Sequence, residues 1–514
     1  MTAAPRFFSR AHAPLIAGAL FSGLILKLVS PPYGLAFIHW LTFVPLFVAV
    51  ASDDRKRNFK LGYLSGFFAV WTLFFWLAQT IDLFSNIPLA LAALIIGLFA
   101  AVWGLPYGLL AMAIHPLRRR FGAWWVLAYP CVWVAGEFLQ PALFPYYQGV
   151  GQYRTPYTWQ LASVFGAMGV SWLVIATNAA VAELVLSRAS KRSLIPFGIV
   201  LALFLGNIGF GYRRFHAVEA ALAGAPVARV SILQQGVTMV QRIQDRGSEV
   251  FKSWMELTGK VVDQKPDLVV WPEGSIYYNP TDKRVLPVFE KMTSEYGFAF
   301  LVGGGTREAD PEDPSKRASW NSAYLFSRDG KITGRYDKMV PMPFGEYLPW
   351  PFSYLDRWIE GVGHFRAGTS PTVFDSGKFT FTTPICYEAI LEKQMRVLSD
   401  ADAYVNITND GWFGDTSAPH QHAMLSAALA VEMGRPMLRI AYTGISMVVE
   451  PHGVIKHETR PYTEVTEVVE LRLAKFDTPY RSWGRYFPWA CAVVAALVLA
   501  MTRKRAVTPA PPAA

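Results

Sequence analysis

Three residues whose side chains can together make and break acyl bonds lie in the second half of the chain, each just after a short run with a strand pattern. They are Glu273 after residues 267–271, Lys338 after residues 331–336, and Cys386 after residues 378–385. Apolar runs of this length predict strands, and residues just past the carboxyl ends of strands commonly form the site of an α/β sheet. A thiol can attack a carbonyl, a carboxylate can take its proton, and an ammonium can stabilise an oxyanion. The set predicts a site of covalent catalysis.

Cys386 is the cysteine that needs a functional explanation. The other two, Cys131 and Cys491, fall inside apolar segments, so the sequence offers no disulfide framework. A lone cysteine is usually a buried structural residue. A predicted helix follows Cys386, and helix amides with a nearby cation can stabilise a thiolate. We favour the reactive interpretation because Glu273 and Lys338 also follow predicted strands.

Further polar residues accompany the three. Glu346 lies in the segment 336–347, which is too rich in Pro and Gly to be a regular helix, and we expect it to orient Lys338 or Glu273. Tyr387 and Glu388 directly follow the cysteine, and we expect them to shape the pocket or a lid.

The composition excludes a purely soluble enzyme. Of 514 residues, 52% are hydrophobic and only 17% are charged. Long uncharged stretches can cross a bilayer, which requires about 20 apolar residues in a helix. The pattern predicts eight spans, at residues 12–29, 34–51, 61–82, 88–114, 122–143, 160–186, 193–211 and 487–502.

The positive charges predict the orientation of these spans. Taking alternate connections, fifteen Lys and Arg residues gather on one side, which should be the cytoplasm, and both termini lie there. Arg213 and Arg214 lie against this rule, at the start of a long translocated domain where the charge bias loses its force. The net charge of +10 thus reflects orientation in the membrane and not a nucleic-acid partner. We expect a multi-pass protein of the bacterial inner membrane with its soluble domain in the periplasm.

The block between the last two spans alternates strand and helix patterns, which is typical of an α/β domain. Strands are expected at residues 227–233, 267–271, 298–303, 323–327, 331–336, 378–385, 403–407, 437–441, 446–450 and 466–471. Helices are expected near residues 246–262, 284–295, 388–399 and 418–433. The domain organisation is therefore a membrane bundle at 1–212, a periplasmic domain at 213–485, span eight at 486–505 and a disordered tail at 506–514.

The contexts of Glu273, Lys338 and Cys386 resemble the nitrilase superfamily. Together with the eight spans, Cys386-Tyr387-Glu388 and the run Pro343-Phe344-Gly345-Glu346-Tyr347 make the whole chain similar to the apolipoprotein N-acyltransferase family. The segment 409–415, His422 and the run Gly434-Arg435-Pro436 add to this likeness. Departures from the family pattern occur at residues 340–342 and 442–444, and after Gln235-Gly236.

The resemblance implies a membrane bundle carrying an αββα sandwich and a ping-pong acyl transfer. A phospholipid would give its acyl chain to Cys386 as a thioester, and the amine of a diacylglyceryl-cysteine apolipoprotein would then accept it. Glu273 would be the base and Lys338 the stabiliser of the oxyanion, with a backbone amide near Tyr387. No cofactor is needed for such chemistry, and we expect a monomer. No metal site is expected either, because His420 and His422 point to different helix faces and no metal or nucleotide motif occurs.

Two other functions remain open. One is a membrane-tethered amidase that hydrolyses a small amide with the same three residues. The other is a transporter or receptor with a periplasmic binding domain, which predicts inverted repeats and several ionisable groups at mid-membrane; the spans show neither. Glu137, near one end of its span, is either functional or placed at the interface. Residues 350–365 are either a lid that dips into the membrane or a loop packed on its own domain.

Overall fold

The computed structural model describes residues 12–85, 87–238, 247–276, 278–355 and 363–503. It divides into two units, one formed by residues 1–142, 146–212 and 482–514, and the other by residues 143–145 and 213–481. The predicted tail at 506–514 and the middle of the predicted lid fall outside the described residues.

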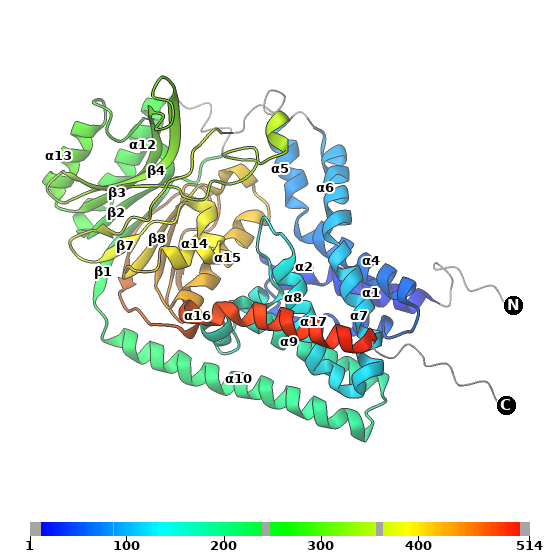
Figure 1. Cartoon of the computed structure of the whole chain (residues 1–514). Coiled ribbons are helices and arrows are strands. Elements are labelled where there is room, and N and C mark those ends of the chain that lie inside the picture. Colours follow the sequence, from blue (N-terminus) through cyan, green and yellow to red (C-terminus); the bar gives the residue numbers. More distant parts are fainter. Residues whose placement is uncertain (1–11, 86, 239–246, 277, 356–362, 504–514) are drawn as a thin grey trace, which may run out of the picture. The chain divides into compact units, whose positions relative to one another are not determined.

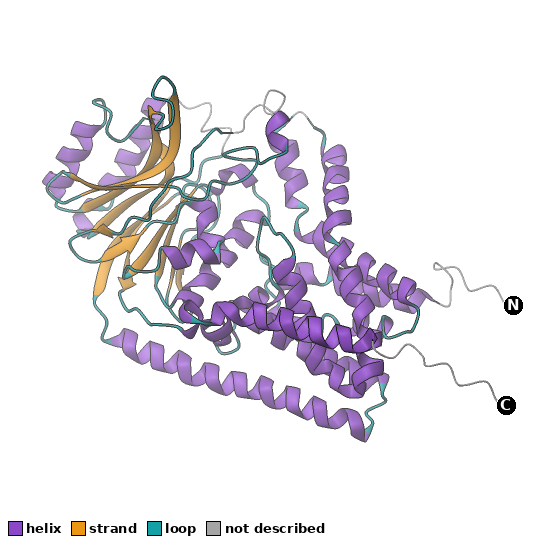
Figure 2. Cartoon of the chain, viewed as in Figure 1, coloured by secondary structure: helices purple, strands orange, loops and turns teal. Residues whose placement is uncertain are grey.

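The first unit is helical (Figures 1 and 2). Its α-helices are α1 (Ala13–Leu24), α2 (Leu26–Val29), α3 (Val44–Ala49), α4 (Arg55–Leu73), α5 (Trp76–Phe84), α6 (Leu89–Trp103), α7 (Leu105–Phe121), α8 (Trp125–Leu139), α9 (Ala162–Leu186), the first part of α10 (Lys191–Ala223) and α17 (Phe487–Arg503). Large aromatic side chains fill its core, among them Phe43, Phe47, Trp125, Tyr129 and Trp133.

Several helices of this unit fit a membrane. Among the described residues, four helical segments are long and apolar enough to cross one, and a fifth counts if the bent pair α4 and α5 is one span. One of the four, Leu89–Leu139, holds two of the predicted spans, and two shorter apolar segments cover the first two. Leucines on α6, α7 and α17 are well exposed, which suits a lipid environment better than water. The count of eight spans stays a prediction.

The second unit contains two six-stranded mixed sheets. The first has the order β12-β1-β2-β3-β4-β5 and the second has the order β11-β10-β9-β8-β7-β6. Three central strands run parallel in each sheet, β1 to β3 in one and β7 to β9 in the other, flanked by antiparallel strands. Two equivalent parallel cores therefore each present the carboxyl ends of their strands, where side chains of a site are commonly placed.

Ten of the twelve strands overlap predicted ones, and β3 and β4 are longer than predicted. The twelve strands are β1 (Val227–Gln234), β2 (Leu268–Ile276), β3 (Ala299–Ala309), β4 (Arg317–Phe326), β5 (Ile332–Asp337), β6 (Phe374–Asp375), β7 (Thr380–Thr382), β8 (Ala403–Thr408), β9 (Met437–Ala441), β10 (Met447–Val449), β11 (Ile455–Glu458) and β12 (Val465–Arg472). The strand expected at 378–385 is shorter, because only β7 pairs regularly and Ile385 makes one isolated bridge to Ile407.

Helices cover the outer faces of both sheets (Figure 1). Helices α12 (Gly247–Gly259) and α13 (Leu286–Tyr296) lie on the first sheet, where Trp254, Trp271 and Phe289 belong to one buried aromatic cluster. Helix α15 (Ala418–Met433) lies on the second sheet, next to the short α14 (Glu392–Val397). With β2 in contact with β8 and β9 across the middle, the layers form an αββα sandwich.

Candidate active site

Glu273 lies where β2 loses its regular pairing with β3. The ladder is regular up to Trp271 and resumes only at Ile276, so the backbone bulges at the glutamate. A side chain at Gly303 on β3 would come within 2.9 Å of the Glu273 Cα, so a glycine is required there. Burial raises the pKa of Glu273, and the Lys338 ammonium opposes that rise. A carboxylate with a raised pKa suits a general base.

Lys338 follows β5 and is almost fully buried, with 1% of its surface exposed. Its Nζ lies 2.6 Å from Glu346 Oε2 and 3.7 Å from Glu273 Oε1. Although burial opposes the charge, the two carboxylates raise the pKa of Lys338 above its ordinary value. Although burial also opposes ionisation of Glu346, the ammonium lowers the pKa of that carboxyl. The site therefore holds a buried ammonium paired mainly with Glu346, beside a second carboxyl.

Asn321 on β4 joins the two carboxyls, a role that the sequence did not reveal. Its Nδ2 donates to Glu273 Oε1 at 2.7 Å and to Glu346 Oε1 at 2.8 Å, which uses both amide hydrogens. The backbone N–H of Asn409, just after β8, donates to Glu273 Oε2 at 2.8 Å. Both oxygens of Glu273 are thus fixed by donors from two different sheets.

Cys386 begins a short 3₁₀ helix, Cys386–Ile390, and has the positive φ of +51°. Such left-handed backbone is costly for a residue with a Cβ and persists only where the surroundings hold it. The regular helix expected from residue 388 starts later, at Glu392. Burial and the Glu273 carboxylate raise the pKa of Cys386 above its ordinary value, while Lys338 lowers it. Burial thus favours the thiol over the thiolate that a helix and a cation alone would stabilise, and attack by this sulfur requires a base, the role expected for Glu273.

Glu388 is fully buried, and it ties the segment after Lys338 to the segment before Cys386. Its Oε1 accepts from Met339 N at 2.7 Å, Val340 N at 3.0 Å and Tyr336 Oη at 2.8 Å. Its Oε2 accepts from Ile385 N at 2.8 Å. Glu388 therefore fixes backbone on both sides of the site.

Replacing Glu388 with glutamine is expected to destabilise the second unit and to slow catalysis. Glutamine supplies one acceptor oxygen and an NH₂ group, so at least one backbone donor would face another donor, at a cost of about 2 kcal/mol. The thermal midpoint of detergent-purified protein should fall by about 5 °C. Glu392→Gln, which removes a charge paired with Arg396 within α14, is the control and should change the midpoint little. An unchanged midpoint for Glu388→Gln would contradict this role.

Tyr387 is also buried beside the cysteine. Its hydroxyl donates to the carbonyl oxygen of Leu143 at 2.6 Å, and its ring meets Phe144 edge to face. Residues 143–145 belong to the same unit as Tyr387. The side chain of Tyr387 thus anchors this short segment.

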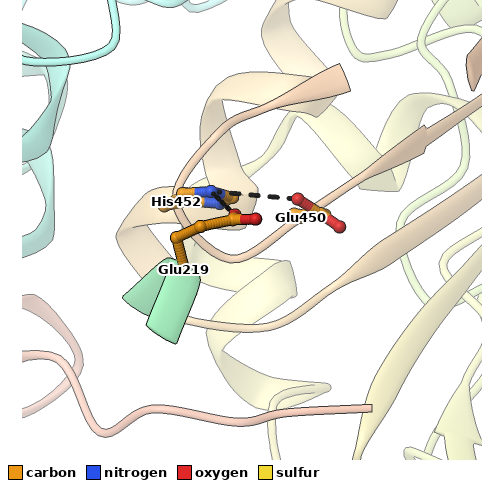
Figure 3. A group of neighbouring side chains, drawn as sticks. All are labelled: Glu219, Glu450 and His452. Carbon is orange, nitrogen blue, oxygen red and sulfur yellow. Dashed lines mark hydrogen bonds and ion pairs between the residues drawn. The ribbon is translucent and has the colours of Figure 1, made fainter. Parts of the chain in front are cut away.

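One group in the described part of the chain has the side chains of a metal site. The ligand atoms of Glu219, Glu450 and His452 lie within 4.8 Å of one another (Figure 3). However, Arg472 pairs with both carboxylates, closely with Glu450 Oε1 and at 3.4 Å with Glu219 Oε1. His452 Nε2 lies 2.8 Å from Glu219 Oε2. Because the Arg472 guanidinium already pairs with both carboxylates, the group fits an ion-pair cluster between α10, β12 and the turn after β10 better than a metal site.

The fold and the site define a class. Residues 229–479 match the family described as carbon-nitrogen hydrolase. An amidase of the nitrilase superfamily from Nesterenkonia AN1 is similar at 18% identity and a TM-score of 0.36, over 49% of this chain and 92% of that chain. The second unit thus matches the carbon-nitrogen hydrolase family and contains two mixed sheets, in a chain that also has several long apolar helices.

Comparisons over the whole chain are more specific. Residues 22–180 match the apolipoprotein N-acyltransferase N-terminal domain. A relative from Sinorhizobium medicae named apolipoprotein N-acyltransferase is 31% identical over 472 residues, 84% of this chain and 85% of the relative. Another of that name from Geobacter metallireducens is 29% identical over 506 residues, 95% of each chain. The chain belongs to the apolipoprotein N-acyltransferase family, which confirms the resemblance noted in the sequence.

Proposed function

We propose that this protein transfers a fatty acyl chain from a membrane phospholipid to the N-terminal amine of a diacylglyceryl-cysteine apolipoprotein. The observation that carries the proposal is the buried group of Glu273, Lys338 and Cys386 in a chain of this family. Lys338 Nζ lies 3.7 Å from Glu273 Oε1, and the charges of both residues influence the Cys386 thiol. A base, a cation and a nucleophile are what a thioester mechanism requires.

In the first half-reaction, Cys386 attacks the ester carbonyl of the phospholipid. Glu273 takes the thiol proton as the S–C bond forms, and a tetrahedral oxyanion results. When the ester C–O bond breaks, Glu273 returns the proton to the leaving oxygen, which departs as the alcohol of a lysophospholipid. The products are a thioester on Cys386 and a free carboxylate on Glu273.

In the second half-reaction, the neutral amine of the apolipoprotein attacks the thioester. The N–C bond forms, the C–S bond breaks, and Glu273 takes the proton that the amine loses. That proton then returns to the sulfur, which restores the resting thiol and carboxylate. The acceptor leaves as an N-acylated lipoprotein.

Stabilisation of the oxyanion falls to Lys338 and the backbone N–H of Tyr387. The Lys338 ammonium is held by Glu346, so it is fixed before the charge develops. A preorganised donor of this kind contributes about 3 kcal/mol to lowering the barrier. Glu346 and Asn321 act through Lys338 and Glu273 by positioning them.

Both substrates carry acyl chains, so the site works at a membrane. We place the protein in the bacterial inner membrane with eight spans, the domain 213–485 in the periplasm and both termini in the cytoplasm. The asymmetry of Lys and Arg between the short connections supports this orientation. The protein acts as a monomer and without a cofactor.

Intact-protein mass spectrometry tests the function directly. Purified protein incubated with phospholipid should gain the mass of one acyl chain, located on Cys386, and should lose it when a diacylglyceryl peptide is added. The peptide should gain the same mass. Release of the chain as free fatty acid, with none on the peptide, would favour the amidase-like alternative and overturn the proposal.

A further inference from the structure

His422 lies beneath the nucleophile, outside the group of residues assigned to the reaction above. It is on α15, and its side chain is buried. Its Nε2 lies 3.3 Å from the backbone carbonyl oxygen of Cys386. Because a carbonyl oxygen can only accept, Nε2 carries a proton and donates it to this oxygen.

The other nitrogen of the imidazole, Nδ1, contacts a buried ion pair. Nδ1 of His422 lies 2.8 Å from Asp410 Oδ1 and 3.2 Å from Arg439 Nη2. Arg439 Nη2 donates to Asp410 Oδ2 at 2.8 Å, and both of these charged side chains have no exposed surface. Although burial opposes its ionisation, Arg439 and His422 lower the pKa of Asp410 below its ordinary value.

Further contacts make this ion pair rigid. Arg439 Nη1 donates to Asn406 Oδ1 at 2.7 Å and to Ser426 Oγ at 3.2 Å. A side chain at Gly444 would collide with Asp410 Oδ2, at 2.0 Å. The imidazole therefore has little freedom to turn away from the Cys386 carbonyl.

The contact at the Cys386 carbonyl matters because of the peptide bond to which it belongs. The carbonyl of Cys386 and the N–H of Tyr387 are the two ends of one peptide unit. A hydrogen bond accepted at the oxygen polarises the unit and strengthens its N–H as a donor. The same hydrogen bond fixes the orientation of Cys386, whose φ is +51°.

We propose that His422 is a positioning residue that holds and polarises the Cys386–Tyr387 peptide, with Asp410 and Arg439 fixing its imidazole. The inference rests on the proposed function in taking the Tyr387 N–H as an oxyanion donor. His422 forms no bond to the substrate and exchanges no proton with it. Its loss lowers the rate of acylation at Cys386 and leaves the number of reactive sites unchanged.

Two substitutions separate this role from simple packing. The amide N–H of glutamine reaches the position of Nε2, and that of asparagine reaches the position of Nδ1. His422→Gln can therefore still donate to the Cys386 carbonyl, and His422→Asn can only contact Asp410. The proposal predicts a loss of about 30-fold in the acylation rate for His422→Asn and for His422→Ala, within the range known for small displacements of reacting groups. His422→Gln should acylate at least tenfold faster than His422→Asn.

The measurement is the single-turnover burst of p-nitrophenolate from a p-nitrophenyl ester, with the burst amplitude giving the fraction of active sites. Amplitudes should stay equal among the variants while rate constants differ. The same substitutions at His420, which points to a different face of α15, are the controls and should leave both quantities unchanged. Equal rates for the glutamine and asparagine variants, or a faster asparagine variant, would overturn the proposal.

The activated ester also separates this inference from the proposed function. If the wild-type protein gives a burst with the ester and no adduct with phospholipid, the proposed donor is wrong while the comparison of the His422 variants still decides the positioning role. If the wild-type protein gives no burst that depends on Cys386, this cysteine is no acyl acceptor, and both proposals fall.

Discussion

Replacing Cys386 with alanine is expected to lower acyl transfer by about 10⁵-fold or more, the size of effect seen when a covalent nucleophile is removed. Without the sulfur no thioester forms, and the remaining groups can only bind and polarise the substrate. Cys386→Ser should also be nearly inactive, because the pKa of a hydroxyl is far above that of a thiol and Glu273 is too weak a base to activate it. Transfer of the acyl chain to a diacylglyceryl peptide, followed by mass spectrometry, measures the loss.

The two other cysteines provide a matched control for this prediction. Cys131 and Cys491 belong to the helical unit, on α8 and α17. Cys131→Ser keeps an acceptor for the indole N–H of Trp172, which lies 3.3 Å from the sulfur. This variant should transfer acyl chains at close to the wild-type rate. Without a nucleophile, the residual activity of Cys386→Ala should be far below about 1% of the wild-type activity. If this variant kept more than about 1%, the reaction would not pass through a thioester on Cys386.

The central strands of the second unit were predictable because the sequence pattern that indicates them is local. Buried parallel strands such as β2 and β8 are short apolar runs, and their residues identify them without knowledge of the partner strand. The edge strand β11, Ile455–Glu458, was missed because it is short and three of its four residues are polar. Strand β6 consists of only two residues, Phe374–Asp375, and no local pattern reveals a pair of that length.

The residues proposed for catalysis were recognisable, and most of their supports were not. A carboxylate, an amine and a thiol, each just after a predicted strand, are unusual enough to notice in a sequence. Asn321 lies in the middle of a strand and His422 in the middle of a helix, and neither residue type is unusual there. Their importance comes from contacts with residues 48 and 36 positions away, which are set only when β4 takes its place beside β3 in the first sheet and when α15 packs against the segment after β7.

The direction of the pKa shift at Cys386 was also beyond the sequence. Strand, turn and helix are local features, and they suggested a stabilised thiolate. Burial, however, is a property of the whole fold, and together with Glu273 it raises the pKa of the thiol. The membrane unit shows a similar limit, because hydropathy locates apolar segments but does not show where a helix bends, as between α4 and α5.

Replacing Glu273 with glutamine is expected to slow acylation of Cys386 by about 10³- to 10⁴-fold. The thiol must lose a proton to attack, and a positioned base contributes about 10²- to 10⁴-fold to such a step. Glutamine cannot accept the proton, and its NH₂ group would face either Asn321 Nδ2 or Asn409 N, both of which now donate to the carboxylate. The effect should therefore lie at the upper end of this range. Glu290→Gln, on the exposed side of α13, is the matched control and should leave the rate unchanged.

The dependence of the rate on pH gives this prediction its sharpest test. The base must be ionised to act, so acylation should fall as the pH drops through the pKa of Glu273. Burial raises that pKa above the usual 4.5 of a glutamate, so the acid limb of the wild-type profile should lie above pH 4.5. Single-turnover rates from pH 5 to 8 in Glu273→Gln should lose this limb and stay uniformly low. If the glutamine variant kept the wild-type acid limb, another group would be the base, and Glu273 would serve only to hold Asn321 and Lys338 in place.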